Sequence, residues 1–175
     1  MPKSLIRASL VVLALWAAVA FAQQPPLNSP LLDHMVGNWV LTGNTEGTPT
    51  SHDVEAEWVL GHHYLRIHEI SRVKNARGEP DYEASVYVAW NEPLKQYACA
   101  WLDVFGGLSA QSIGVATLEE NKIPFIFHDP KGVLNFENDF IYDPKTDTWQ
   151  WVLDGVTNGV HKPFARYQLK RASKT

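Results

Sequence analysis

Apolar and polar positions alternate with a period of two along most of the chain after residue 37, and short polar segments interrupt the alternation. Successive side chains of a β-strand point to opposite faces, and the aromatic and β-branched residues that are abundant here favour strands. The pattern predicts ten strands, at residues 38–42, 53–60, 63–71, 82–90, 97–103, 112–118, 124–128, 133–142, 148–153 and 164–170.

The connectors at residues 91–95, 119–122 and 143–147 are short and polar, which indicates antiparallel neighbours. About ten such strands either form two sheets or close into a barrel, and closure removes both sheet edges. Several strands carry large side chains on one parity and mixed polar groups on the other, as expected for a wall around a partly polar interior. In residues 133–142 the first set is at positions 134, 136, 138, 140 and 142 and the second at 135, 137, 139 and 141. We therefore predict an all-β fold, a single antiparallel up-and-down β-barrel of about ten strands.

One short helix is predicted directly before the first strand. Ser29 precedes Pro30, the order typical of a helix start, and apolar residues follow at positions 31, 32, 35 and 36. Gly37 would end this helix, and the Pro-rich residues 23–30 form a leader without regular structure. The predicted barrel domain covers residues 31–171.

The first 22 residues have the three parts of a cleavable signal peptide. Lys3 and Arg7 give a positive start, residues 8–20 are apolar, and Ala20-Phe21-Ala22 offers a cleavage site before Gln23. The alternative is a retained anchor, but 13 apolar residues fall short of the roughly 20 that span a bilayer. We expect export to the periplasm or the outside of the cell, and a mature protein without a membrane span.

Cleavage after residue 22 would leave 153 of the 175 residues, enough for one domain with its own core. The loss of Lys3 and Arg7 takes the formal net charge from −4 to −6, and the basic residues do not cluster. Nucleic acid is therefore not an expected partner. Cys99 is the only cysteine and lies in an apolar stretch, so we expect a buried, unreactive thiol.

Gly37-Asn38-Trp39 places a Gly-x-Trp motif after the predicted helix and at the opening of the first strand. This feature resembles the calycin barrels, which include the lipocalins, and the resemblance implies that the tryptophan plugs one end of the barrel. Roughly residues 31–171 are similar to the bacterial family called domain of unknown function 1579. That resemblance supports the fold and implies no function, since the family has none firmly assigned. The matching motifs are Glu57-Trp58-Val59-Leu60-Gly61, Tyr64-Leu65-Arg66, Tyr87-Val88-Ala89-Trp90-Asn91, Lys95-Gln96-Tyr97 and Trp101-Leu102-Asp103.

Nitrobindin is a distantly similar barrel, and the resemblance implies haem held by a histidine on a late strand. The final predicted strand, residues 164–170, contains no histidine, and His161 precedes it outside the predicted barrel wall. No cofactor is therefore expected, although haem held by a different histidine stays open.

Residues 62–69, His-His-Tyr-Leu-Arg-Ile-His-Glu, form the densest polar cluster. Alternation puts positions 62, 64, 66 and 68 on one face of a strand and the other four on the opposite face. We favour an inward position for Tyr64 and Arg66, which would make a polar binding wall. The alternative is that Leu65 and Ile67 mark the inward face.

Metal binding and acid-base chemistry each need residues from several strands. His62 and His68 are about 20 Å apart along one strand, too far for one ion, so His128 or Asp103 would have to join one of them. No metal site is expected, because no metal-binding spacing occurs. Acid-base chemistry would use His68, Asp103 or Glu137. The alternatives are a turn role for Asp103 and an outward position for Glu137.

Aromatic residues recur along the strands, and part of them must fill the core. A barrel of about ten strands is wider than its wall side chains can fill, so other aromatics should line a cavity. The predicted ligand site consists of Trp58, Tyr64, Arg66, His68, Tyr87, Trp101, Phe136, Trp149 and Trp151.

Three functions fit these features. The preferred one is an exported binding protein for a small apolar or aromatic molecule, with Arg66 or His68 orienting a polar end. The second is a cofactor-independent lyase or isomerase, which requires at least two of its acid-base residues to converge in one cavity. The third is a structural or interaction protein of the cell envelope, which requires an exposed apolar patch. The sequence does not define an oligomeric state.

Overall fold

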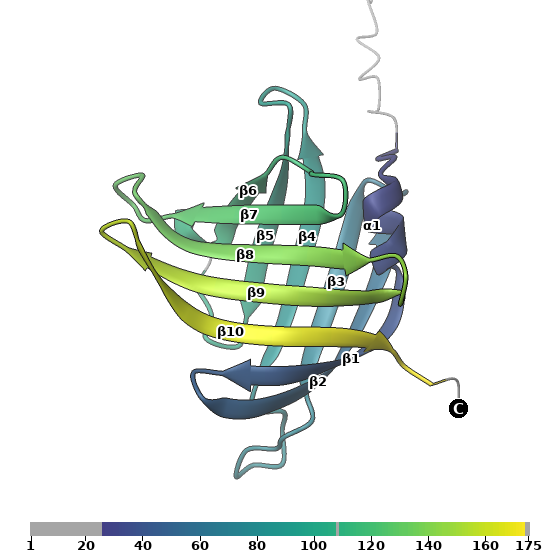
Figure 1. Ribbon diagram of the computed structural model, residues 1–175, viewed down its shortest axis with the longest axis vertical. Coiled ribbons are helices and arrows are strands. Elements are labelled where there is room, and N and C mark those ends of the chain that lie inside the picture. Colours follow the sequence, from purple (N-terminus) through teal and green to yellow (C-terminus); the bar gives the residue numbers. More distant parts are fainter. Residues whose placement is uncertain (1–25, 108, 174–175) are drawn as a thin grey trace, which may run out of the picture.

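Each of the ten predicted segments forms a strand, and the strands close into one antiparallel barrel (Figure 1). The computed structural model describes residues 26–107 and 109–173. The helices are α1 (Pro30–Met35) and a short 3-10 turn η1 (Ala110–Ser112). The strands are β1 (Gly37–Thr45), β2 (Thr48–Val59), β3 (Tyr64–Ser71), β4 (Glu83–Asn91), β5 (Gln96–Asp103), β6 (Ile113–Ala116), β7 (Lys122–His128), β8 (Leu134–Asp143), β9 (Thr148–Thr157) and β10 (Val160–Arg171).

The strands follow one another around the barrel in chain order, and β1 pairs with β10 to close it. This closing pair runs in register from Trp39 opposite Arg171 to Thr45 opposite Ala165. The first and last strands are therefore paired with each other, and closure removes both sheet edges. The predicted all-β, up-and-down barrel with one short N-terminal helix is confirmed.

The last two strands are longer than predicted. The sequence pattern ended one strand at residue 153 and began the next at 164, whereas β9 runs to Thr157 and β10 starts at Val160. Asn158 and Gly159 form the turn between them with φ angles of 52° and 74°, the left-handed geometry that a two-residue hairpin requires. Asn-Gly is a strong hairpin signal, and the prediction missed it because His161-Lys162-Pro163 does not resemble a strand.

Helix α1 covers one end of the barrel, here called the closed end. The Ser29 hydroxyl accepts a hydrogen bond from the Leu32 amide at 3.5 Å and caps the helix start, and Leu32 and Met35 are fully buried. Trp39 lies beneath the helix, where its indole nitrogen donates to the Met35 carbonyl at 2.7 Å. The Arg171 guanidinium carbon lies 3.7 Å from the centre of the same indole ring. The closed end is therefore sealed by packing and by hydrogen bonds.

Large side chains fill the barrel behind this seal. Phe125, Phe140 and Trp149 are fully buried from three successive barrel neighbours, β7, β8 and β9. Each such side chain contributes about 1.5–3 kcal/mol through removal of apolar surface from water. Cys99 is buried on β5, and burial raises the pKa of its thiol to about 12. This confirms the expected buried position of the cysteine.

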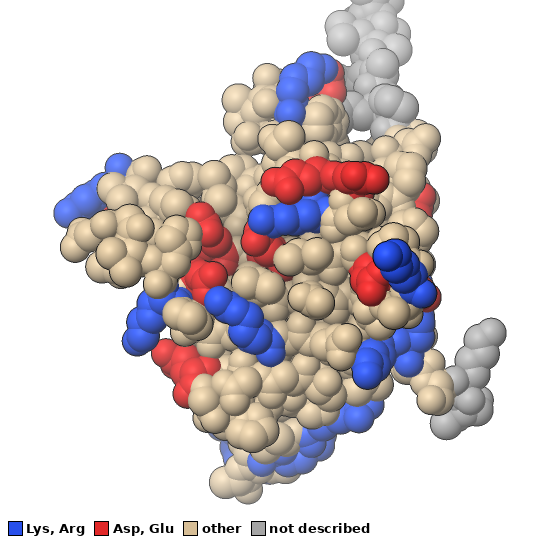
Figure 2. Space-filling model, in the orientation of Figure 1, with Lys and Arg blue, Asp and Glu red and all other residues tan. Residues whose placement is uncertain are grey.

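The outer wall carries charges of both signs. Figure 2 shows acidic and basic side chains in small mixed groups on the viewed face. Several form ion pairs across neighbouring strands, including Lys122 with Asp139 at 2.8 Å and Arg166 with Asp154 at 2.6 Å.

Candidate functional site

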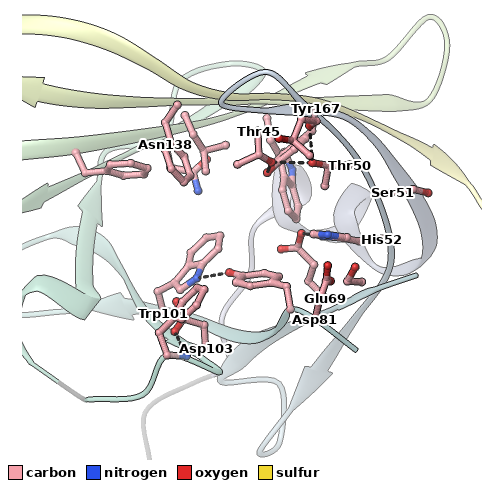
Figure 3. Close-up of a pocket in the computed structure, with 18 of the residues that line it drawn as sticks. Thr45, Thr50, Ser51, His52, Glu69, Asp81, Trp101, Asp103, Asn138 and Tyr167 are labelled. Atoms are coloured by element: carbon pink, nitrogen blue, oxygen red, sulfur yellow. Dashed lines mark hydrogen bonds and ion pairs between the residues drawn. The ribbon is translucent and has the colours of Figure 1, made fainter. Parts of the chain in front are cut away.

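A cavity of about 640 Å³ lies at the end of the barrel opposite α1 and is called here the barrel cavity. Strand β9 runs from the closed end to the cavity. At the closed end the Trp149 indole donates to the His34 carbonyl of α1, whereas Trp151 and Leu153 line the cavity. Figure 3 shows Asn138, Trp101 and His52 projecting into this space from different sides. The fold therefore leaves one half of the barrel filled and the other half hollow.

Aromatic rings form much of the cavity wall. The Trp151 ring stacks on Phe140 with centroids 4.6 Å apart. Phe136 packs edge-on between Phe127 and Phe164, at centroid distances of 6.2 and 5.6 Å. These contacts fix the rings before any ligand arrives, which lowers the entropy cost of binding a flat apolar molecule.

Two buried polar side chains meet in the opposite wall. His52 on β2 is 7% exposed and Glu69 on β3 is 4% exposed, and His52 Nδ1 lies 2.5 Å from a Glu69 carboxylate oxygen. The register pairs Val54 with Glu69 and His52 with Ser71, so the pair is diagonal on the inner face. Since the hydrogen bond engages Nδ1, the other ring nitrogen of His52 remains for a cavity partner.

Two tyrosines extend this polar region. The Tyr82 ring stacks on His52 with centroids 5.5 Å apart, and its hydroxyl accepts a hydrogen bond from Trp101 at 3.2 Å. Tyr167 shares a 2.6 Å hydrogen bond with the Thr45 hydroxyl. Burial, reinforced by the negative charge of Glu69, raises the pKa of both phenols above the ordinary value. Both hydroxyls are therefore neutral near pH 7 and can donate or accept hydrogen bonds.

Three residues of the cavity lining also carry buried polar atoms without partners. The side-chain oxygen of Asn138, a residue only 1% exposed, makes no hydrogen bond, and neither does the Trp151 indole nitrogen. The Asn135 side-chain oxygen is also buried and makes no hydrogen bond. Buried polar groups in folded proteins nearly always have partners, so these enclosed atoms are exceptions. All three belong to side chains of the cavity lining, which is therefore polar as well as aromatic.

The structure places three of the predicted ligand-site residues, Trp101, Phe136 and Trp151, in the wall of the barrel cavity. Two others lie at the closed end. Trp149 is fully buried beside α1, and Trp58 donates to the Asp33 carboxylate of that helix at 2.8 Å. These two indoles hold the helix on the barrel and do not line the cavity.

The favoured inward orientation of Tyr64 and Arg66 is wrong. Leu65 and Ile67 are 0 and 1% exposed, so they mark the inner face of β3. The alternative prediction, with these two residues inward, is the correct one. The guanidinium of Arg66 instead reaches Glu57 at 2.6 Å on the outer wall.

Two more members of the predicted ligand site share this outward parity. His68 contacts Glu83 at 2.8 Å, and Tyr87 lies opposite Arg66 in the register of β3 with β4. Neither is among the residues that line the barrel cavity. Neither Arg66 nor His68 is therefore placed to orient a molecule inside the barrel.

The predicted acid-base residues do not converge. Asp103 lines the cavity, but His68 lies outside, and Glu137 faces His161 at 3.3 Å on the outer wall. Asp103 also has the predicted turn role, because its carboxylate accepts the Phe105 amide at 3.0 Å. The condition set for an enzyme built on these three residues is not met.

Two histidines bear on the haem that the nitrobindin resemblance implies, His161 and His52. His161 lies within β10, contrary to the prediction that it precedes the final strand, but its half-exposed ring faces Glu137. Among the described residues of the lining, His52 is the one histidine, and no Lys or Arg is present to receive propionates. The described part of the chain also contains no group of three His, Cys, Asp or Glu side chains that could hold a metal ion.

Sequence reasoning missed His52, Glu69 and Asn138 as site residues. His52 has the same parity as the buried Val54 and Ala56, so the inner face of β2 could have been extended to it. Glu69 lies on the same face of β3 as Leu65 and Ile67, but the apolar residues of that face end at Ile67. A signal for Asn138 was present, since it lies between Phe136 and Phe140 on one face.

Comparison of the sequence with protein-family models and with curated proteins gives no match. Among the helices of the described residues, none is long and apolar enough to cross a membrane. The predicted signal peptide at residues 1–22 lies outside the described residues. The fold and the site together define a closed β-barrel with an aromatic and polar cavity at one end.

Proposed function

We propose that the protein is exported and binds a small apolar or aromatic molecule in the barrel cavity. The proposal rests on a cavity of about 640 Å³ whose lining combines rigid aromatic rings with a few polar side chains, among them the His52–Glu69 pair. A volume of this size is within the range of small-molecule sites, which are mostly apolar with a few polar groups that orient the ligand. The signal-peptide pattern supports export, and the similarity to domain of unknown function 1579 remains part of the proposal.

The binding proposal is tested with N-phenyl-1-naphthylamine, a neutral aromatic probe whose emission rises in apolar surroundings. We expect saturable binding to the purified protein. The variant Asn138→Trp places a large side chain in the cavity and should weaken binding at least about tenfold. Tyr87→Trp makes a matched change on the outer wall and should leave the affinity unchanged. Equal binding by both variants, each with a native circular dichroism spectrum, would show that the probe binds elsewhere.

Export is tested separately by the N-terminal sequence of the protein recovered from the cell envelope or medium. We expect the mature chain to begin at Gln23. A chain that retains Lys3 and Arg7 in the cytosol would refute the export part of the proposal and leave ligand binding untouched.

The His52 and Glu69 pair favours proton transfer as a second candidate function. A carboxylate that holds Nδ1 fixes the orientation of the imidazole, and Nε2 can then act as the base. A general test is elimination of 5-nitrobenzisoxazole, whose ring opens when a base removes its C–H proton. We expect catalysis in the wild-type protein and its loss in His52→Gln. Equal rates in both proteins would exclude His52 as a base.

A further inference from the structure

The charges that line the barrel cavity are nearly all of one sign. Glu69, Asp81 and Asp103 contribute three formal negative charges, and His52 can contribute at most one positive charge. Among the described residues of the lining there is no Lys or Arg. The cavity is therefore negative in either protonation state of the histidine.

These carboxylates are not neutralised by neighbours from outside the cavity. Among the described residues, neither Asp81 nor Asp103 forms an ion pair with a cationic side chain, and Glu69 pairs only with His52. Asp103 accepts a backbone amide at the mouth, which leaves its charge in place. The negative charge of Glu69 also acts on two other residues of the wall, since it contributes to the raised pKa of Tyr82 and of Tyr167.

A second, independent observation comes from Asn138. Its side-chain oxygen is an acceptor, it is buried, and it lacks a donor. Figure 3 shows Asn138 across the cavity from Glu69. The Trp151 indole nitrogen is the counterpart that lacks an acceptor. Asn138 therefore adds a neutral polar group to the wall, and the carboxylates of Glu69, Asp81 and Asp103 add the charged acceptors.

The aromatic wall suits the same kind of ligand. Trp101 and Tyr82 stand beside the polar region, and the faces of such rings attract cations. An anionic ligand would have to leave water for a low-dielectric space with no Lys or Arg to receive it, which is strongly unfavourable. An ammonium group would find acceptors, counter-charge and ring faces together.

We propose that the barrel cavity selects organic cations, amines with an aromatic or aliphatic body, with Glu69 as the principal counter-charge, and that it rejects carboxylates of the same shape. This inference rests on the proposed binding function and narrows its ligand class.

Three probes with one ring system separate charge from shape: 1-naphthylmethylamine, 1-naphthalenemethanol and 1-naphthoate. Their affinities are measured by isothermal titration calorimetry at pH 7 and at two salt concentrations. We expect the amine to bind at least about tenfold more tightly than the carboxylate, with the alcohol between them. Salt should change this ratio little, because Glu69, the principal counter-charge, is buried and buried charges are poorly screened.

Two cavity variants assign the selectivity to its source. Glu69→Gln keeps the shape and a hydrogen-bonding group beside His52, and Asp103→Asn keeps the acceptor for the Phe105 amide. Each should lower the amine-to-carboxylate ratio to about a third or less of its wild-type value. Glu57→Gln removes a carboxylate from the outer wall and should not change the ratio. Asp103→Asn keeps the test decisive if Glu69→Gln does not fold.

The outcomes separate a failure of cation selection from a failure of the proposed binding function. Equal binding of amine and carboxylate, or tighter binding of the carboxylate, overturns the selection of cations while the alcohol still demonstrates a binding cavity. If Glu57→Gln lowers the amine-to-carboxylate ratio as much as the cavity variants do, the selection of cations by the cavity is also overturned. The preference for the amine would then come from the net charge of the protein. Binding of no probe at all removes the proposed binding function and the inference together.

Discussion

Replacement of Asn138 by leucine should stabilise the protein, although the residue is buried. The Asn138 side-chain oxygen has no hydrogen-bond partner and is fully enclosed. Most buried polar side chains are held by hydrogen bonds, and loss of those bonds destabilises the protein. An unpaired acceptor carries a cost instead, since it has left water without compensation.

The size of the expected change in the free energy of unfolding follows from the unpaired Asn138 oxygen. A buried acceptor without a partner costs about 1–3 kcal/mol, and leucine at this position removes that cost and adds apolar surface between Phe136 and Phe140. The free energy of unfolding should therefore rise by about 1–3 kcal/mol. For a domain of this size each kcal/mol raises the Tm by about 2–4 °C, so a shift of about 2–12 °C is expected.

The assay is thermal unfolding followed by circular dichroism, with urea unfolding as a second measure. Gln150→Leu is the matched control, because Gln150 is an exposed amide on the neighbouring strand β9. Its effect should stay within about 0.5 kcal/mol. A loss of more than about 1 kcal/mol in Asn138→Leu would refute the reasoning, since it would show that the amide is satisfied in the empty barrel.

Three further predictions concern the framework of the barrel. Cys99 should not react with a thiol reagent at pH 8 in the native protein and should react in urea, because burial raises its pKa to about 12; fast native labelling would contradict this. Gly43→Ala should destabilise by about 1–3 kcal/mol in urea unfolding, because the new methyl group would meet the backbone oxygen of Arg166, and an unchanged midpoint would contradict the packing. Arg171 lowers the pKa of Asp147 through a hydrogen bond, so this pair stabilises the protein above about pH 4 and loses that effect as the pH falls. Arg171→Gln should therefore flatten the loss of stability between pH 4 and 3 in unfolding measurements at several pH values, and an unchanged slope would contradict the pairing.

Local patterns were sufficient to predict the architecture. Alternation located all ten strands, Ser29 and Pro30 located the helix, and short polar connectors implied antiparallel neighbours. These features depend on residues close together in the chain, and the sequence shows such residues directly. The aromatic residues Trp101, Phe136 and Trp151 were also predicted as site residues, and they lie in the cavity wall.

Tertiary structure decided which face of each strand points inward and which residues meet there. Alternation divides β3 into two faces without naming the inner one, and the inner face is apolar at Leu65 and Ile67 but polar at Glu69. It changes character because one end of the barrel is filled and the other is hollow, a difference that no single strand contains. His52 and Glu69 meet only because the β2–β3 register brings them together. Alternation along the chain was enough to predict the ten strands, whereas closure of the barrel determined which face of each strand is the inner one and, with it, the cavity and its negative charge.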